Sequence, residues 1–158
     1  MIRLIAAIDD RRGIATATGI PWSLPEDAAY FRDRTRTGLI LMGRSTYDEF
    51  ASPLHDRENY VLTHDDTVPL RDGFVAVPSL DDLRARVPDG DVWVIGGAAV
   101  YAATIGQADE LFLTRVLADF DCTKFFPPFE DGFTLTSEGE EHEDGGVRFR
   151  FQTWRTVG

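Results

Sequence analysis

The sequence predicts an α/β fold in which helices cover a mainly parallel sheet. Six apolar, β-branched runs are separated by stretches whose apolar residues recur with helical spacing. Strand alternating with helix is typical of parallel sheets with helices on their faces. Toward the C-terminus the pattern changes to strict alternation of apolar and polar residues, which predicts an antiparallel hairpin.

The expected strands are rich in valine, isoleucine, leucine and aromatic residues, which suit a pleated, buried surface. They lie at residues 2–8, 39–42, 59–63, 74–77, 91–95 and 110–116. The stretches with helical spacing predict helices at residues 24–36, 44–50, 79–87 and 97–105. The hairpin strands FTLTSEG and VRFRFQTWR flank residues 140–146, an acidic segment that we interpret as a solvated loop.

Length and composition indicate one globular domain spanning residues 1–158. No apolar run approaches the roughly 18 residues of a membrane span. The apolar run at the N-terminus is too short for a signal peptide, and acids follow it. Cys122 is the single cysteine and cannot form an internal disulfide, which fits a reducing compartment. We therefore expect a soluble, cytoplasmic protein, with no reason to expect more than a monomer.

The charge of the chain limits its partners. A formal net charge of −11 argues against nucleic acid, because binding there depends on lysine and arginine neutralising phosphates. Lys124 is the only lysine, so arginine supplies almost all of the positive charge. Two explanations stay open for this bias, a GC-rich coding sequence or a surface adapted to salt.

Residues 20–27, IPWSLPED, place two prolines and a tryptophan in front of two carboxylates. Ser23 and Glu26 have the S-x-x-E spacing of a capping box. Pro25 is tolerated in a first helical turn because its missing N–H would have no partner there. A helix is therefore expected to begin near Leu24.

Asp27 lies in the first turn of that helix. Tyr30, Phe31 and Arg34 follow three, four and seven residues later, so one helical face carries an acid and then aromatic rings. In one interpretation this face lines a pocket. In the other, both acids only complement the positive end of the helix dipole.

Two expected strands run directly into glycine at the start of a helix. LILM is followed by Gly43 and Arg44, and DVWVI is followed by Gly96 and Gly97. Helix N-termini offer free N–H groups to anions, and ligands of open α/β sheets bind beyond the carboxyl ends of the strands. One such turn alone would more often be tight packing. Two of them in one cleft suggest a ligand with several phosphates, such as a dinucleotide, although the G-x-G-x-x-G fingerprint is absent.

These motifs together resemble the dihydrofolate reductase family over essentially the whole chain. The segments IAAI, IPWSLPEDAAYF, LMGRSTYDEF, PLHDR, VIGGAAVY and LFLTRV occur in the family's order. The resemblance implies a central, mainly parallel eight-stranded sheet with an antiparallel C-terminal hairpin, flanked by four helices. It also implies NADPH-dependent reduction of 7,8-dihydrofolate, and dihydrofolate and antifolate inhibitors as small-molecule partners.

The resemblance assigns the catalytic and substrate-binding positions. Asp27 resembles the carboxylate that binds the N3 and 2-amino edge of the pteridine and promotes protonation at N5. Trp22 resembles the tryptophan that holds a water near this acid, and Thr114 the hydroxyl that hydrogen-bonds it. Arg57 resembles the arginine that binds the α-carboxylate of the glutamate tail, although a surface arginine paired with Asp56 is the alternative. The apolar positions around the rings are Ile5, Ala7, Phe31, Phe50, Leu54 and Ile95, each of which alone fits plain core.

The resemblance also implies where NADPH binds, and it implies no metal. Arg44 matches the expected partner of the 2′-phosphate, and the peptide between Gly96 and Gly97 is cis in the family. Residues 15–20 resemble the mobile loop that closes over the nicotinamide, with a passive loop as the alternative. The matching positions are Ala7, Ile14, Ile20, Gly43, Arg44, Ser45, Thr46, Leu62, Thr63, His64, Ile95, Gly96, Gly97, Ala98, Val100 and Tyr101.

The chain departs from the family pattern at four places. Ala15 stands where glycine is usual, and Asp56 precedes Arg57 where it could compete with the substrate carboxylate. Phe50 is bulkier than the usual aliphatic residue. Residues 121–123, Asp-Cys-Thr, occupy the place where some members have an acid that supports loop closure.

Two other functions stay open. A pyrimidine reductase of riboflavin synthesis would share the fold and NADPH, but it would not need the W-x-L-P-x-D motif. A catalytically silent nucleotide-binding paralogue would bind NADPH and reduce no folate. His142 lacks the spaced partners of a metal site, and no histidine has the partners of a hydrolase.

Overall fold

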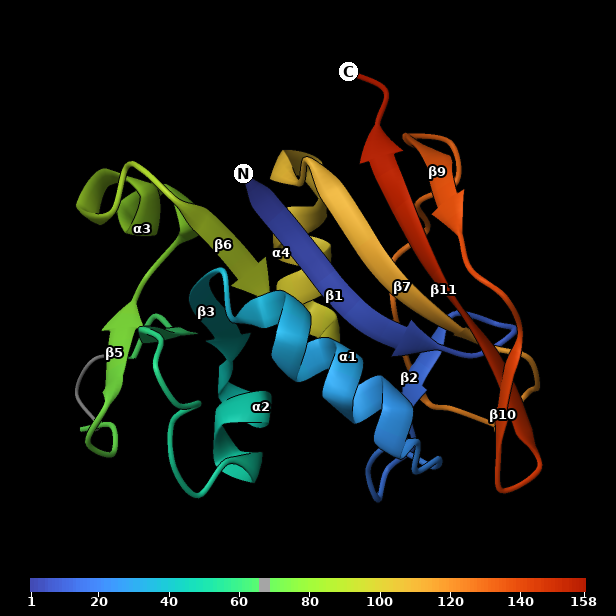
Figure 1. The fold of residues 1–158 in the computed structure, drawn as a ribbon. Coiled ribbons are helices and arrows are strands. Elements are labelled where there is room, and N and C mark those ends of the chain that lie inside the picture. The colour runs from blue at the N-terminus through green and yellow to red at the C-terminus, as the bar shows by residue number, and fades with distance from the viewer. Residues whose placement is uncertain (66–68) are drawn as a thin grey trace.

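Strands and helices alternate in the computed structural model as the sequence predicts (Figure 1). The structure describes residues 1–65 and 69–158. The six expected strands form, each within about one residue of its predicted ends. They are β1 (Ile2–Ile8), β3 (Gly38–Gly43), β4 (Asn59–Leu62), β5 (Phe74–Val77), β6 (Asp91–Val94) and β7 (Glu110–Val116).

These strands pair in parallel in the order β7-β1-β6-β3-β4-β5. The N-terminal strand β1 lies inside the sheet, between β6 and β7. Its Leu4 and Ile8 are fully buried, as expected for a parallel strand whose two faces are both covered. The carboxyl ends of the six strands share one edge of the sheet, the edge at which open α/β sheets bind ligands.

The C-terminal hairpin is antiparallel, as predicted, but its loop is shorter than expected. β11 (Val147–Thr156) pairs with β7 on one side and with β9 (Phe133–Glu138) and β10 (His142–Asp144) on the other. β9 and β10 lie end to end, so the nine strands of the described sheet occupy eight positions across it. The loop interpretation is wrong for residues 142–144. Gly145 and Gly146 have positive φ and close the turn alone, which leaves the preceding residues free to pair.

The four expected helices form within one residue of their predicted ends. They are α1 (Pro25–Thr35), α2 (Arg44–Glu49), α3 (Leu80–Arg86) and α4 (Ala98–Thr104), and a 3₁₀ turn, η1 (Ile105–Gln107), follows α4. Figure 1 shows α1 in front of the sheet and α4 behind it. No helix among the described residues is long and apolar enough to cross a membrane.

Alternation along the strands divides the core between the two faces. Leu39 and Leu41 of β3 pack in the cluster that includes residues of α3 and α4. Ile40 and Met42 point the other way, into the cluster with Tyr47 of α2 and the rings of α1. The sheet is therefore the middle of three layers, and α1 and α2 share the face that faces the viewer in Figure 1.

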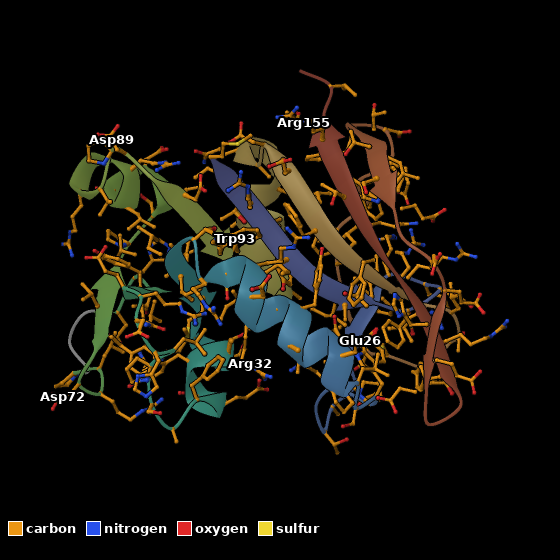
Figure 2. The ribbon with its side chains drawn as sticks, viewed as in Figure 1. Glu26, Arg32, Asp72, Asp89, Trp93 and Arg155 are labelled. Atoms are coloured by element: carbon orange, nitrogen blue, oxygen red, sulfur yellow. The ribbon has the colours of Figure 1, made fainter. Side chains whose placement is uncertain are left out.

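Helix α1 begins where the sequence predicts, but the capping box is wrong. The N-cap is Leu24, in an extended conformation, and no side chain caps the helix. Pro25 takes the first helical position, so the Ser23 hydroxyl lies one residue too early to cap. Glu26 instead places Oε2 2.6 Å from Nδ1 of His142 in β10. Figure 2 shows Glu26 at the end of α1 that faces the hairpin.

The sequence does not predict a short two-stranded ribbon that the structure contains. β2 (Gly13–Ala15) and β8 (Lys124–Phe125) pair antiparallel outside the main sheet. The N–H of Thr123 also donates to the Ala15 carbonyl at 2.9 Å. The ribbon therefore joins the segment after β1 to the segment after β7, and it contains or adjoins Ala15 and residues 121–123, where the sequence departs from the pattern it resembles.

A buried carboxylate holds the same two segments together. Asp9 is 1% exposed and accepts hydrogen bonds from the N–H groups of Arg11, Gly13 and Phe120 at 2.9, 2.7 and 3.0 Å. A Cβ at Gly13 would lie 2.4 Å from Cβ of Cys122 and 2.8 Å from Oδ1 of Asp9. Only glycine therefore fits at this position.

Candidate active site

A cleft of about 690 Å³ opens at the carboxyl edge of the parallel strands. It lies between α1 on one side and the turns that begin α2 and α4 on the other. Most of the sequence-predicted site residues line it. These are Ile5, Ala7, Ile14, Ile20, Trp22, Asp27, Phe31, Ser45, Thr46, Phe50, Leu54, Ile95, Gly96, Gly97, Ala98, Tyr101 and Thr114.

Asp27 is the acid of this cleft, placed there by the first turn of α1. Its Oδ1 accepts a hydrogen bond from the Thr114 hydroxyl of β7 at 2.6 Å. Burial raises the pKa of Asp27, and the bond from Thr114 only partly opposes that shift. No described residue donates to its other oxygen, Oδ2, which leaves that oxygen for a ligand. Asp27 is therefore a carboxylate that holds a proton more readily than usual and can pair with a donor in the cleft.

Trp22 forms part of the wall beside this acid. Its ring packs edge-to-face on Phe120, with centroids 5.2 Å apart and an interplanar angle of 67°. Leu24 is buried behind it, in the small core cluster formed with Val116 and Phe149. The aromatic wall thus rests on the segment after β7, and the opening of α1 is fixed between this wall and the sheet.

The two glycine turns adjoin across the floor of the cleft. The Gly43 N–H donates to the Gly96 carbonyl at 2.7 Å, and the Gly96–Gly97 peptide is cis, as the resemblance implies. A Cβ at Gly96 would lie 3.2 Å from Oγ1 of Thr46, and one at Gly97 would lie 3.4 Å from Oγ of Ser45. The backbone that leads into α4 therefore meets the hydroxyl groups of α2 in one polar cradle.

Tyr101 fastens α4 to the central strand. Its buried hydroxyl donates to the Ile5 carbonyl at 2.6 Å, and its ring packs against Phe126 with centroids 4.9 Å apart. Burial, and to a smaller extent the nearby charge of Asp27, raise the pKa of this phenol. Tyr101 therefore stays protonated and keeps the diglycine turn in place beside β1.

Several sequence-predicted residues lie outside the lining, namely Gly43, Arg44, Arg57, Leu62, Thr63, His64 and Val100. Gly43 has a packing reason instead, because a Cβ there would lie 2.5 Å from Cγ2 of Val100. Arg44 has its Nε 3.8 Å from Asp48 and lies over the ring of Tyr47. The cofactor contacts expected of these residues, and the substrate contact expected of Arg57, stay predictions.

Arg57 is tied to the end of α1. It donates to Oγ1 of Thr35 at 2.7 Å and to the His55 carbonyl at 2.8 Å. Burial and the charge of Arg36 lower the pKa of Arg57, and Asp56 opposes this only in part. An ion pair with Asp56 is not found among the described residues, which leaves further N–H groups of the guanidinium for a ligand.

Sequence reasoning missed three charged residues of the lining: Arg32, Glu49 and Lys124. Arg32 projects from α1 (Figure 2) and follows Ala28, another lining residue, by one helical turn. Because Ala28 is not itself expected in the site, this spacing offers no signal in the sequence. Lys124, as the only lysine, was visible by composition, but its place depends on β8, which the sequence does not reveal.

Comparison with known proteins agrees with this geometry. The dihydrofolate reductase family model matches residues 1–156. A dihydrofolate reductase of Bacillus subtilis is 35% identical, with 96% of this chain and 92% of that protein covered. One from Heliothis virescens is 32% identical, covering 99% and 97%.

A solved structure shares the fold. It is a dihydrofolate reductase from Enterococcus faecalis complexed with NADP(H) and RAB-propyl, and it superposes with a TM-score of 0.90 at 23% identity, covering 100% of this chain and 97% of that one. The family model and the relatives above reach across nearly the whole sequence. The chain therefore belongs to the dihydrofolate reductase family.

Proposed function

We propose that this protein catalyses the NADPH-dependent reduction of 7,8-dihydrofolate to 5,6,7,8-tetrahydrofolate. The observation that carries the proposal is the pairing of Asp27 with Thr114 in the cleft that also holds the diglycine turn. Relatives that carry the dihydrofolate reductase name over nearly their whole length support it. Tetrahydrofolate from this reaction would supply one-carbon units for thymidylate, purine and glycine synthesis.

The substrate side of the cleft lies against α1. Asp27 accepts hydrogen bonds from the N3 and 2-amino edge of the pteridine, since a carboxylate can accept two parallel donors. Ile5 and Phe31 supply apolar walls for the ring, and Phe50 and Leu54 lie farther along the lining, where they suit the benzoyl group. Arg57, with N–H groups still free, is suited to the α-carboxylate of the tail.

The other side of the cleft fits a dinucleotide phosphate. Gly96 and Gly97 bring backbone close to the hydroxyls of Ser45 and Thr46, and a side chain at Gly96 would crowd Thr46. The related Enterococcus faecalis enzyme was solved with NADP(H), which supports NADPH as the cofactor here. When bound, NADPH supplies the hydride that is added to C6 of the substrate.

The chain's own residues then orient the reactants and hold the proton. Asp27 keeps the pteridine in one orientation, and its raised pKa favours protonation at N5. Trp22 walls off the acid and positions a water beside it. The segment from Thr16 to Gly19, closed by backbone bonds of 2.9 and 3.2 Å, and the exposed Ile20 suit a loop that covers the nicotinamide.

We further propose that the protein works as a monomer in the cytoplasm, without nucleic acid or membrane partners. Its net charge of −11 supports the absence of nucleic acid. A single buried cysteine, Cys122, supports a reducing compartment.

The test is to follow loss of NADPH absorbance on adding dihydrofolate, at low and at high salt. Wild type should turn over, and Asp27→Asn should not. Glu26→Gln is the matched control, because it neutralises the neighbouring acid, which lies outside the lining, and should keep turnover. NADPH binding without folate reduction at either salt would favour the silent paralogue, and reduction of an aminopyrimidine ribose substrate instead would favour the pyrimidine reductase.

A further inference from the structure

A second, smaller cleft of about 420 Å³ lies on the other side of the β2–β8 ribbon. It shares no lining residue with the active-site cleft. Its walls come from the turn after β1, the end of β7, β8 and the segment that leads to β9. The lining residues are Asp10, Arg11, Arg12, Arg115, Phe125 and Glu130.

Three arginines in one hollow are unusual for a chain with a net charge of −11. Neither Arg12 nor Arg115 forms an ion pair with any residue in the described ranges. Arg11 reaches Asp119 only at 3.7 Å, and both side chains are largely exposed, so solvent weakens this pair. The two acids of the lining leave the hollow with an excess of positive charge.

Two of the three guanidinium groups, those of Arg12 and Arg115, contact the fold. Nη1 of Arg12 donates to the Phe126 carbonyl at 2.6 Å, and the Phe126 N–H donates back to the Arg12 carbonyl at 2.8 Å. Arg115 stands over the ring of Phe129, with 6.0 Å from Cζ to the ring centroid. A positioned guanidinium loses less side-chain freedom when it binds a ligand, which favours planar, bidentate contacts with oxyanions.

The ribbon separates this hollow from the active site. Neighbouring residues of a strand point to opposite faces, and in β8 Lys124 lines the active-site cleft whereas Phe125 lines the hollow. Phe125 also lies under Arg11, with 5.7 Å from Cζ to the ring centroid. An aromatic face thus stands beside the cationic groups, as in sites that bind a phosphate attached to a ring.

We propose that this hollow is a binding site for a phosphate-bearing anion, with Arg115 and Arg12 as the phosphate contacts and Phe125 as a surface for an attached ring. The proposal does not depend on the reductase reaction. It requires that a polyphosphate binds outside the active-site cleft and that the loss of Arg115 weakens that binding.

Calorimetry of the full-length protein tests it, with tripolyphosphate and ATP as probes. The titrations are done with NADP⁺ at saturation, so that the phosphate positions of the active-site cleft are filled, and at about 0.1 M salt to suppress diffuse attraction. Wild type should bind one equivalent of probe. Arg115→Gln should weaken binding about tenfold or more, since it removes a charge-assisted contact. Arg115→Lys keeps the charge but loses the planar fork, so its affinity for the probe should lie between those of wild type and Arg115→Gln.

Arg86→Gln is the matched control. Arg86 is an exposed arginine of α3, at the far edge of the sheet from the ribbon (Figure 1), and its loss changes the net charge equally. Amide chemical shifts locate the probe, and those of Arg12 and Phe125 should move. The proposal is overturned if wild type binds neither probe, if Arg86→Gln weakens binding as much as Arg115→Gln, or if only the amides of Ser45 and Thr46 respond.

Discussion

Asp9 and Asp27 are both carboxylates removed from bulk water near the carboxyl edge of the sheet, yet their environments act in opposite directions. Burial acts to raise the pKa of each. At Asp9, backbone N–H groups of Phe120, Gly13 and Arg11 outweigh burial, and the pKa is lowered. At Asp27 only the Thr114 hydroxyl opposes burial, and the pKa is raised.

The number of hydrogen-bond donors therefore separates a carboxylate with a lowered pKa from one with a raised pKa. Asp9 has donors on both oxygens and is held as an anion that binds two segments together. Asp27 has a single hydrogen-bond donor within the described part of the chain, and it lines the cleft. The same side chain thus stabilises the fold at one position and remains available for a ligand at the other.

The largest expected effect is on turnover. Asp27→Asn should lower kcat/KM for dihydrofolate by about 10²- to 10⁴-fold, because it removes the group that we propose orients the pteridine and favours its protonation. The same variant should unfold at an equal or higher denaturant concentration than wild type at pH 7, because the amide still accepts the Thr114 bond and no charge is buried. A clear loss of stability together with retained turnover would reverse the roles of the two acids.

Asp9→Asn should show the opposite pattern. An amide NH₂ would face one of the backbone donors, so the free energy of unfolding should fall by about 2–3 kcal/mol, while turnover falls much less than in Asp27→Asn. Urea denaturation followed by circular dichroism measures this. Asp10→Asn, one residue on, serves as the control for stability. An unchanged midpoint for Asp9→Asn would show that its three hydrogen bonds contribute nothing net.

The two acids should also give stability opposite dependences on pH. With its lowered pKa, Asp9 contributes stability above the ordinary aspartate pKa of 3.8, and this contribution is lost as pH falls through its folded pKa. Asp27 has a raised pKa, so the folded protein keeps a proton that the unfolded chain releases, and stability falls as pH rises from 3.8 through the folded pKa. Unfolding free energies of wild type and each variant, measured from pH 3 to 7, should diverge in these opposite senses. Parallel curves would contradict the assignment.

Thr114→Val should change how the rate depends on pH. Without the hydroxyl, burial acts on Asp27 unopposed, and its pKa should rise further. The pH dependence of kcat/KM reports that shift. Thr104→Val is a matched control, because it removes a buried hydroxyl that donates to the Val100 carbonyl, away from Asp27. Equal shifts in both variants would refute a specific effect of Thr114.

The smallest effect concerns Cys122, the neighbour of Asp9. Burial and then the charge of Asp9 raise the pKa of this thiol to about 11, so alkylation at pH 8 should be slow in the folded protein and fast in denaturant. Asp9→Asn should accelerate it severalfold. Thiol titration over time checks both, and a wild-type rate equal to that of the denatured chain would contradict the burial of Cys122 beside a charge.

Sequence alone predicts the parts of this molecule that depend on patterns within one segment. The alternation in β3 predicts both its strand and its burial, and the helices end within a residue of their expected limits. The family motifs predict that Asp27 and Thr114 lie together, although 87 residues separate them. Local patterning does not identify partners that are brought together by tertiary structure.

The failures all involve such partners. Ser23 and Glu26 have capping-box spacing, but Pro25 occupies the first helical position and makes Leu24 the N-cap. The Glu26 carboxylate pairs with His142 instead. The β2–β8 ribbon has too few residues to show a period. In the sequence Asp9 has no feature that distinguishes it from other acids in turns. Its role depends on the hydrogen bond from the N–H of Phe120, which is distant in the sequence. Arg32 is a charged residue, and its residue type predicts a side chain in solvent rather than one in the wall of a cleft.

The position of β1 between β6 and β7 has a consequence for the protein's synthesis. The first strand to leave the ribosome is one of the last to find its neighbours, because the Ile2 N–H pairs with the Asp109 carboxylate, 107 residues later. At about 5–20 residues per second, translation of that interval takes on the order of ten seconds. Until β6 and then β7 have been made, β1 lacks its neighbours in the sheet, and an apolar strand with unpaired edges favours aggregation. β1 is paired on both edges only after β7, which carries Thr114, has been synthesised and has paired with it.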